Sequence, residues 1–196
     1  MGLLGRLAEI VSSYAAVAWW GLVSPRIEHA PLVVFQGAVI GPQGVLLAVR
    51  STLRGWELPG GEALPGESGE DAVAREILEE TGVPVAVEYH VADYVRTGFR
   101  PHTARIYRCR PLEGVTRTSE ETLRVGWFPP EAPPETIFPW FRGPLEDALS
   151  LEPEACPVTR YEHQGRRAIL DGLAIDLRMR LSNDGADGAA PDGRAL

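Results

Sequence analysis

Lysine is missing from this sequence, and all 19 of its basic residues are arginine. Cysteine is scarce, because the 196 residues contain two, Cys109 and Cys156, far apart and outside any C-x-x-C pair. This usage argues against a disulfide scaffold or a cysteine metal motif, and we expect two free thiols in a cytoplasmic protein. The four histidines lack the mutual spacing of zinc ligands, so a zinc site is not expected either.

The start of the chain lacks a hydrophobic run long enough to cross a membrane. The uncharged run of residues 10–23 has 14 residues, whereas a spanning helix needs about 20. Residues 3–23 show helical apolar periodicity, and we assign residues 1–25 to an N-terminal amphipathic helix. Three roles stay open for it: docking on the domain or on a second subunit of a homodimer, lying in a membrane interface, or acting as a cleaved signal.

Negative charge is concentrated in one segment of the chain. Residues 57–80 hold eight acidic residues and one basic residue, which account for seven of the eight net negative charges. Such local acidity fits a cation site better than a generally acidic, solubilising surface. A broad basic face that could hold a phosphate backbone is not evident, so we expect no nucleic-acid partner.

Local signals predict a helix over about residues 69–81, inside this acidic segment. Ser68 can cap the N-terminus, and Asp71 three residues later supplies the acid of a capping box. Gly82 stands where a left-handed glycine commonly ends a helix. The first half of the acidic segment, around Gly60 and Gly61, is a glycine loop that Arg50 and Arg54 flank, as phosphate contacts or as solvated surface.

Three glutamates lie on one face of the predicted helix. Glu76, Glu79 and Glu80 stand at positions i, i+3 and i+4, where like charges repel by a few tenths of a kcal/mol. Anions near a helix C-terminus are unfavourable as well. A cation between the carboxylates would offset both costs, and oxygen-only ligands suit Mg²⁺ or Mn²⁺ rather than zinc. The alternative from these residues alone is a solvated acidic face.

The glutamates belong to a longer pattern with fixed spacing. It comprises Gly61, Glu67, Arg75-Glu76-Ile77, Glu79-Glu80 and Gly82-Val83. Every fixed position of the Nudix box is filled, so the chain resembles the Nudix hydrolase family, strictly in the box and more loosely over residues 31–150. The resemblance implies an α/β fold, an α/β/α sandwich with a mixed β-sheet, and Mg²⁺-dependent hydrolysis of a nucleoside diphosphate linked to another group.

The resemblance also assigns roles to residues of the box. Glu79 and Glu80 are implied as metal ligands, and Glu76 as a further ligand or as the general base. Arg75 would orient a carboxylate through a charge-assisted fork. Glu67 is implied to contact the metal indirectly or from an outer position. The backbone carbonyl of Gly60 is implied as a metal ligand.

Some members of this family take the general base from a loop far from the box. Glu120 and Glu121 lie in a polar loop just before the strand-like residues 123–128, which is where such a glutamate is expected. The catalytic candidates are therefore Arg75, Glu76, Glu120 and Glu121. Exposed acids of a surface loop are the alternative for the last two.

The remaining pattern predicts one domain over residues 26–181. Strands are expected at 32–40, 45–50, 85–97, 103–109 and 123–128, and a helix at 141–151. Residues 158–163 and 166–181 predict a C-terminal strand and helix beyond a minimal Nudix domain. Residues 182–196, rich in Gly, Ala and Asp, are expected to form a disordered tail.

The box does not identify the substrate. The first hypothesis is a small nucleoside diphosphate derivative such as a nucleotide sugar or ADP-ribose. The second is a nucleoside triphosphate, cleaved to remove damaged or surplus nucleotides. The third is a catalytically silent nucleotide sensor, and the intact acids of the box argue against it. A membrane-tethered enzyme acting on a lipid-linked diphosphate is a fourth.

Overall fold

The computed structural model describes residues 10–12, 14–15, 18–19, 32–153 and 155–182. Eight strands and three helices follow one another from residue 33 to residue 181 of this part of the chain. They are β1 (Val33–Gly41), β2 (Gly44–Arg50), β3 (Trp56–Glu57), β4 (Gly60–Glu62), α3 (Gly69–Thr81), β5 (Val85–Gly98), β6 (His102–Pro111), β7 (Thr122–Phe128), α4 (Pro139–Ser150), β8 (Val158–Gln164) and α5 (Arg166–Leu181).

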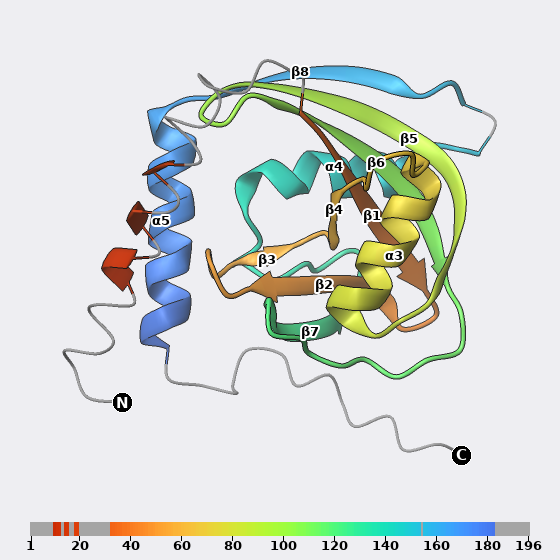
Figure 1. Cartoon of the computed structure of the whole chain (residues 1–196), viewed down its shortest axis with the longest axis horizontal. Coiled ribbons are helices and arrows are strands. Elements are labelled where there is room, and N and C mark those ends of the chain that lie inside the picture. The colour runs from red at the N-terminus through yellow and green to blue at the C-terminus, as the bar shows by residue number, and fades with distance from the viewer. Residues whose placement is uncertain (1–9, 13, 16–17, 20–31, 154, 183–196) are drawn as a thin grey trace.

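The strands form one mixed sheet in the order β3-β2-β1-β6-β5-β8, with β4 paired to β1 and β7 paired to β2 (Figure 1). β1 runs parallel to β6, and β5 runs parallel to β8, while the other pairs are antiparallel. β1 and β2 share only two registered pairs, at Ile40↔Val45 and Gly41↔Gly44. The strands predicted at 32–40 and 45–50 therefore pair with each other only beside the turn that joins them, and the rest of each strand pairs with other partners.

Helices α3 and α4 cover opposite sides of the sheet, which gives the expected α/β/α sandwich (Figure 1). Val73 and Ile77 of α3 pack in one core with Val39 of β1. The core on the other side contains Phe141 and Leu145 of α4. Alternate residues of each strand point to opposite faces, so a single strand such as β1 can feed both cores.

Two glycines allow the backbone around α3 to pack closely. A Cβ at Gly37 would lie 2.4 Å from Cδ1 of Ile77, so the side chain's absence lets α3 approach β1. Gly60 has a φ of +149°, and a Cβ there would lie 2.1 Å from the carbonyl oxygen of Phe35. The glycine loop is thereby held against β1, where the N–H of the buried Gly60 donates to Glu80 near the end of α3.

The C-terminal extension is docked on the domain. In α5, Asp176 is fully buried and forms an ion pair with Arg180, at 2.8 Å. Asp176 Oδ1 also accepts the backbone N–H of Arg54, at 2.6 Å, and Arg180 Nη2 donates to the carbonyl of Thr52, at 3.1 Å. Hydrogen bonds from α5 therefore anchor the segment 51–55, which joins β2 to β3.

Part of the predicted N-terminal helix is described. Residues 10–12, 14–15 and 18 are α-helical, and Tyr14 hydrogen-bonds to the Asp176 carboxylate. Burial, and then this bond, raise the pKa of Tyr14 to about 12. The contact fits a helix docked on the domain. No helix in the described ranges combines the length and hydropathy that a membrane span requires.

Some predictions concern residues that the structure does not describe. Residues 183–196 of the predicted tail, and most of the predicted helix 3–23, lie outside the described residues. The division into a helix at 1–25, a domain at 26–181 and a tail at 182–196 therefore stays a prediction. Both predicted C-terminal elements, in contrast, are present as β8 and α5.

Candidate active site

Helix α3 begins and ends at the predicted signals. The backbone N–H of Asp71 donates to Ser68 Oγ at 3.1 Å, and Ser68 Oγ donates to Asp71 Oδ2 at 2.8 Å. At the other end Gly82 adopts a left-handed conformation, with φ of 75°, and its N–H donates to the carbonyl of Leu78. These caps fix where α3 begins and ends, and the packing of Val73 and Ile77 in the core sets the direction in which its glutamates point.

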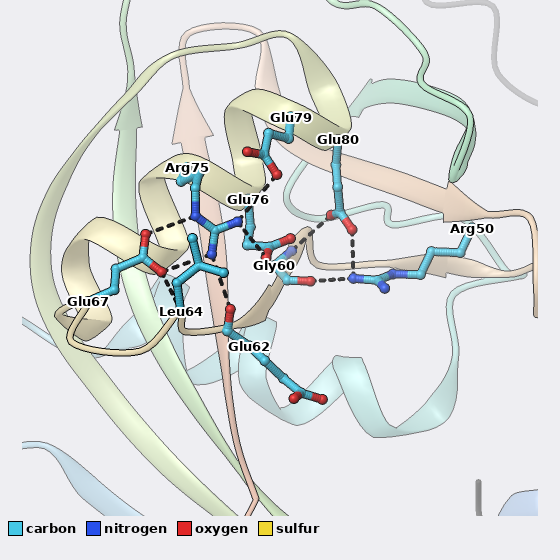
Figure 2. Close-up of polar contacts among 9 residues, drawn as sticks. All are labelled: Arg50, Gly60, Glu62, Leu64, Glu67, Arg75, Glu76, Glu79 and Glu80. Atoms are coloured by element: carbon cyan, nitrogen blue, oxygen red, sulfur yellow. Dashed lines mark hydrogen bonds and ion pairs between the residues drawn. The ribbon is translucent and has the colours of Figure 1, made fainter.

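Arg75 joins three of the predicted carboxylates into one network (Figure 2). Its guanidinium forms a two-pronged contact with Glu67, from Nε to Oε1 at 2.8 Å and from Nη2 to Oε2 at 2.9 Å. Nη1 donates to Glu76 Oε1 at 2.8 Å and to Glu79 Oε2 at 3.3 Å. Nη2 also reaches the backbone carbonyl of Glu62 in β4, at 3.1 Å. Arg75 thus ties α3 to the loop that follows the glycines.

The fork on Arg75 keeps Glu67 ionised. Hydrogen bonds from Arg75, and then the backbone N–H of Leu64 at 2.8 Å, lower the pKa of Glu67 to about 2. The carboxylate of Glu67 is therefore charged at neutral and mildly acidic pH. Because Glu67 accepts the N–H of Leu64 within its own loop and two bonds from Arg75 of α3, it both shapes the loop and joins it to the helix.

Glu80 is the most buried of the predicted ligands, with 4% of its surface exposed. Its Oε2 accepts the backbone N–H of Gly60 at 3.0 Å, and its Oε1 lies 2.6 Å from Nη2 of Arg50 (Figure 2). Burial raises the pKa of Glu80 to about 7, although Arg50 and the N–H of Gly60 oppose the shift. The carboxylate is therefore stabilised less well by the protein alone than an exposed one would be by water.

Arg50 and Glu57 join the site without having been predicted as members of it. Arg50 Nε forms an ion pair with Glu57 Oε1 at 2.7 Å, and burial raises the pKa of Glu57 while Arg50 lowers it. The Arg50 side chain is 31% exposed and paired with two carboxylates, so it is not a freely solvated group, and a phosphate contact for it stays a prediction. One sequence signal could have found the pair: a β2–β3 hairpin places Glu57 opposite Ala48, on the strand face that Arg50 shares.

Glu120 and Glu121 lie apart from this network. Both side chains are exposed in the segment just before β7, and neither takes part in the ion pairs of the box glutamates within the described part of the chain. The carbonyl of Glu121 accepts the N–H of Ser51 at 2.8 Å, so the backbone of the segment lies beside the end of β2. The structure brings Glu67, Arg75, Glu76, Glu79 and Glu80 together with Gly60.

The carboxylates do not already surround a common point. Among the described residues, no three His, Cys, Asp or Glu side chains are arranged as a metal site, and Arg75 and Arg50 hold the box carboxylates in ion pairs. The donor set nevertheless fits a hard divalent cation, since it consists of carboxylate oxygens and the Gly60 carbonyl. Oε1 of Glu80 is buried and lacks an aligned hydrogen bond, because its contact with Arg50 is an ion pair only.

A strained turn outside the box reaches β4. Arg100, between β5 and β6, has a φ of +47° and contacts Glu62 Oε1 through Nη2 at 3.3 Å. Its carbonyl accepts the Nδ1–H of His102 at 2.6 Å, and His102 Nε2 accepts from Arg96 Nη1 at 3.3 Å. Burial lowers the pKa of His102 to about 4; the bond to the carbonyl opposes this shift, and the charges of Arg96 and Arg100 add to it.

His102 should make the protein less stable in mild acid. Between about pH 6.5 and 4 the unfolded chain protonates this histidine and the folded chain does not, so the free energy of unfolding falls as the pH falls. The loss amounts to at most about 3 kcal/mol. Urea unfolding of His102→Asn between pH 7 and 4.5 should show a shallower decline than the unmodified protein. His163→Gln changes an exposed histidine, and its free energy of unfolding should fall with pH as steeply as that of the unmodified protein. An equally steep fall in all three proteins would contradict the role of His102.

Comparisons with known proteins identify the family and the fold of this chain. The NUDIX domain family model matches residues 31–148. A MutT-like protein of Streptomyces ambofaciens is 39% identical over 137 residues, which cover 69% of this chain and 86% of that protein. The 8-oxo-dGDP phosphatase NUDT18 of Mus musculus is 35% identical over 150 residues, covering 65% of this chain and less than half, 44%, of that protein. A NUDIX hydrolase structure from Nitrosomonas europaea has a TM-score of 0.60 at 22% identity, covering 69% of this chain and 81% of the other.

Proposed function

The chain belongs to the Nudix family, and from that premise we propose that it hydrolyses a phosphoanhydride bond of a small nucleotide by Mg²⁺-dependent attack of water on phosphorus. One observation carries the proposal. Arg75 gathers Glu67, Glu76 and Glu79 on one side of α3, and Glu80 lies against Gly60 beside them. A helix that served only as a solvated face would have no need of a buried glutamate at this position.

The proposed metal contacts are the carboxylates of Glu76, Glu79 and Glu80 and the carbonyl of Gly60, with Glu67 as an outer contact. When bound, Mg²⁺ or Mn²⁺ would neutralise phosphate charge and make water a better nucleophile. Arg75 acts as a positioning residue in this proposal. Its four contacts with Glu67, Glu76 and Glu79 hold those carboxylates in defined rotamers before a ligand arrives.

Glu76 is the proposed general base, or a further ligand if another group accepts the proton. Its side chain is 19% exposed, and one of its oxygens, Oε1, is held by Arg75. A Cβ at Gly61 would lie 2.6 Å from Oε2 and 2.7 Å from Oε1, so the whole carboxylate of Glu76 lies against the glycine loop. Glu120 and Glu121 stay alternatives for the base, and they would have to approach from the exposed segment before β7.

Two substrate classes fit the proposed chemistry. A nucleoside diphosphate linked to another group, such as a nucleotide sugar or ADP-ribose, is the first. The second is a nucleoside di- or triphosphate with a damaged base, and the names of the two curated relatives favour it, since one is a MutT-like protein and the other an 8-oxo-dGDP phosphatase. Both classes present a phosphate chain that needs charge neutralisation.

A substrate panel with and without chelator tests the proposal. The panel should hold nucleotide sugars, ADP-ribose, dinucleoside polyphosphates, coenzyme A, and unmodified and 8-oxo nucleoside di- and triphosphates. Phosphate is measured directly, after added pyrophosphatase, and after added phosphatase, which separates the three kinds of product. We expect turnover of at least one class with Mg²⁺ and its loss in excess EDTA, because the carboxylates cannot neutralise phosphate charge by themselves.

The control for this experiment is EDTA that has been saturated with Mg²⁺ beforehand. It should leave turnover unchanged, because it removes no metal from the protein. Full turnover in excess free EDTA would contradict the proposed mechanism. Release of two phosphate-monoester products from ADP-ribose would favour the first substrate class, and preferential turnover of 8-oxo nucleotides would favour the second.

A further inference from the structure

One nitrogen atom of Arg50 lies between two of the proposed metal contacts. Nη2 of Arg50 hydrogen-bonds to the carbonyl oxygen of Gly60 and lies 2.6 Å from Oε1 of Glu80 (Figure 2). A divalent ion held by these two oxygens would approach each of them within about 2.0–2.1 Å for Mg²⁺. The ion and the guanidinium nitrogen cannot occupy this position together, because their radii overlap and their charges repel.

A second contact of Arg50 is independent of these two oxygens. Its Nε pairs with Oε1 of Glu57 at 2.7 Å, and the Glu57 side chain is 14% exposed. Glu57 lies in β3, whereas Glu80 lies in α3, so the two carboxylates approach Arg50 from different elements. The Arg50 side chain can therefore lose its contact with Glu80 and keep its contact with Glu57.

The charges of Arg50, Glu57 and Glu80 also favour the replacement of Arg50 by a divalent ion beside Glu80. Two carboxylates, the buried Glu80 and the partly buried Glu57, share the single positive charge of Arg50. A buried charge is costly unless it is paired, so a cation beside Glu80 stabilises its carboxylate form. Arg50 supplies that cation in the metal-free protein, and a divalent ion would supply twice the charge at the same oxygens.

We propose that Arg50 is an internal counter-cation that holds the metal position beside Gly60 and Glu80 and must leave it when a divalent ion binds. This inference rests on the proposed function, because it takes Gly60 and Glu80 as metal contacts. Arg50 then lowers the affinity of the free protein for metal, and in exchange keeps the buried carboxylate paired when metal is scarce. It is a positioning residue, and its effect should be visible in metal binding without any substrate.

The test is Mn²⁺ binding to the nucleotide-free protein, measured by electron paramagnetic resonance of the unbound ion. Arg50→Gln should bind Mn²⁺ about fivefold or more tightly than the unmodified protein, since the competing cation is gone. Arg50→Lys should fall between the two, because a single ammonium keeps the charge but cannot span Glu57 and Glu80 together. Arg124→Gln is the matched control: this residue lies on β7 opposite Val49, next to Arg50, and it takes no part in either ion pair.

The outcomes separate this inference from the proposed function. Unchanged or weaker Mn²⁺ binding by Arg50→Gln, together with loss of binding in Glu80→Gln, would overturn the role of Arg50 and leave the metal site standing. Absence of Mn²⁺ binding in the unmodified protein and in all variants would overturn both. If Arg50→Gln does not fold, the Arg50→Lys comparison decides: affinity equal to that of the unmodified protein would overturn the inference.

Discussion

Replacing Glu80 with glutamine is expected to lower turnover by about 100-fold or more while the fold stays intact. Even residues that only support a metal ligand are commonly worth 10- to 100-fold in activity or affinity, and Glu80 is proposed as a ligand itself. Glutamine keeps the size of the side chain, and its oxygen can still accept the backbone N–H of Gly60. The loss should therefore come from the missing charge, because a neutral amide is a weaker ligand for Mg²⁺.

The measurement pairs kcat and KM over a range of Mg²⁺ concentrations with circular dichroism of the variant. Glu79→Gln should behave alike, since Glu79 occupies the neighbouring proposed ligand position. Glu70→Gln is the control, because this exposed glutamate lies in the first turn of the same helix and outside the box pattern. Turnover of Glu80→Gln equal to that of Glu70→Gln would remove Glu80 from the proposed metal contacts.

Asp176→Ala should lower the free energy of unfolding by about 3–5 kcal/mol. That range is typical when one partner of a buried ion pair is removed and the other charge is left buried. Asp176 is fully buried, and the side chain of Arg180, its partner, is 3% exposed. The substitution would also leave the backbone N–H of Arg54 without its carboxylate acceptor.

Urea unfolding at neutral pH measures this effect, provided that the dependence on urea is the same for both proteins. Arg178→Ala is the matched control on the same helix, because its ion pair with Glu135 is exposed on both sides. Exposed ion pairs contribute little, so this variant should stay close to the original stability. If Asp176→Ala changes stability no more than Arg178→Ala does, the buried pair does not hold α5 on the domain.

Local signals predicted α3 well because they act within a few residues. Ser68 and Gly82 mark the ends of the helix, which spans Gly69–Thr81, and the strands at 85–98, 102–111 and 122–128 also lie close to their predicted ranges. The partners of the strands could not be predicted in the same way. The parallel pairing of β1 with β6 joins segments about 70 residues apart, and no local pattern encodes it.

The site was predictable where it follows helix periodicity and unpredictable where it depends on strand pairing. Glu76, Glu79 and Glu80 are spaced by the helix itself, so the sequence indicated their common location. Arg50 and Glu57 meet only because β2 and β3 pair with Ala48 opposite Glu57. The contact between Arg54 and Asp176 depends on the packing of α5, because the two residues are 122 positions apart in the sequence, and only the three-dimensional structure could reveal it.

The contact between α5 and the segment 51–55 bears on the order in which parts of the protein fold during synthesis. The box is complete once residue 83 has been translated, whereas the segment 51–55 receives its anchor only when Asp176 and Arg180 have left the ribosome. Chains emerge at about 5–20 residues per second, so the nascent protein carries its acidic helix for several seconds before the loop following Arg50 is secured. The segment 51–55 should therefore gain its contacts with α5 only after the box helix has been synthesised.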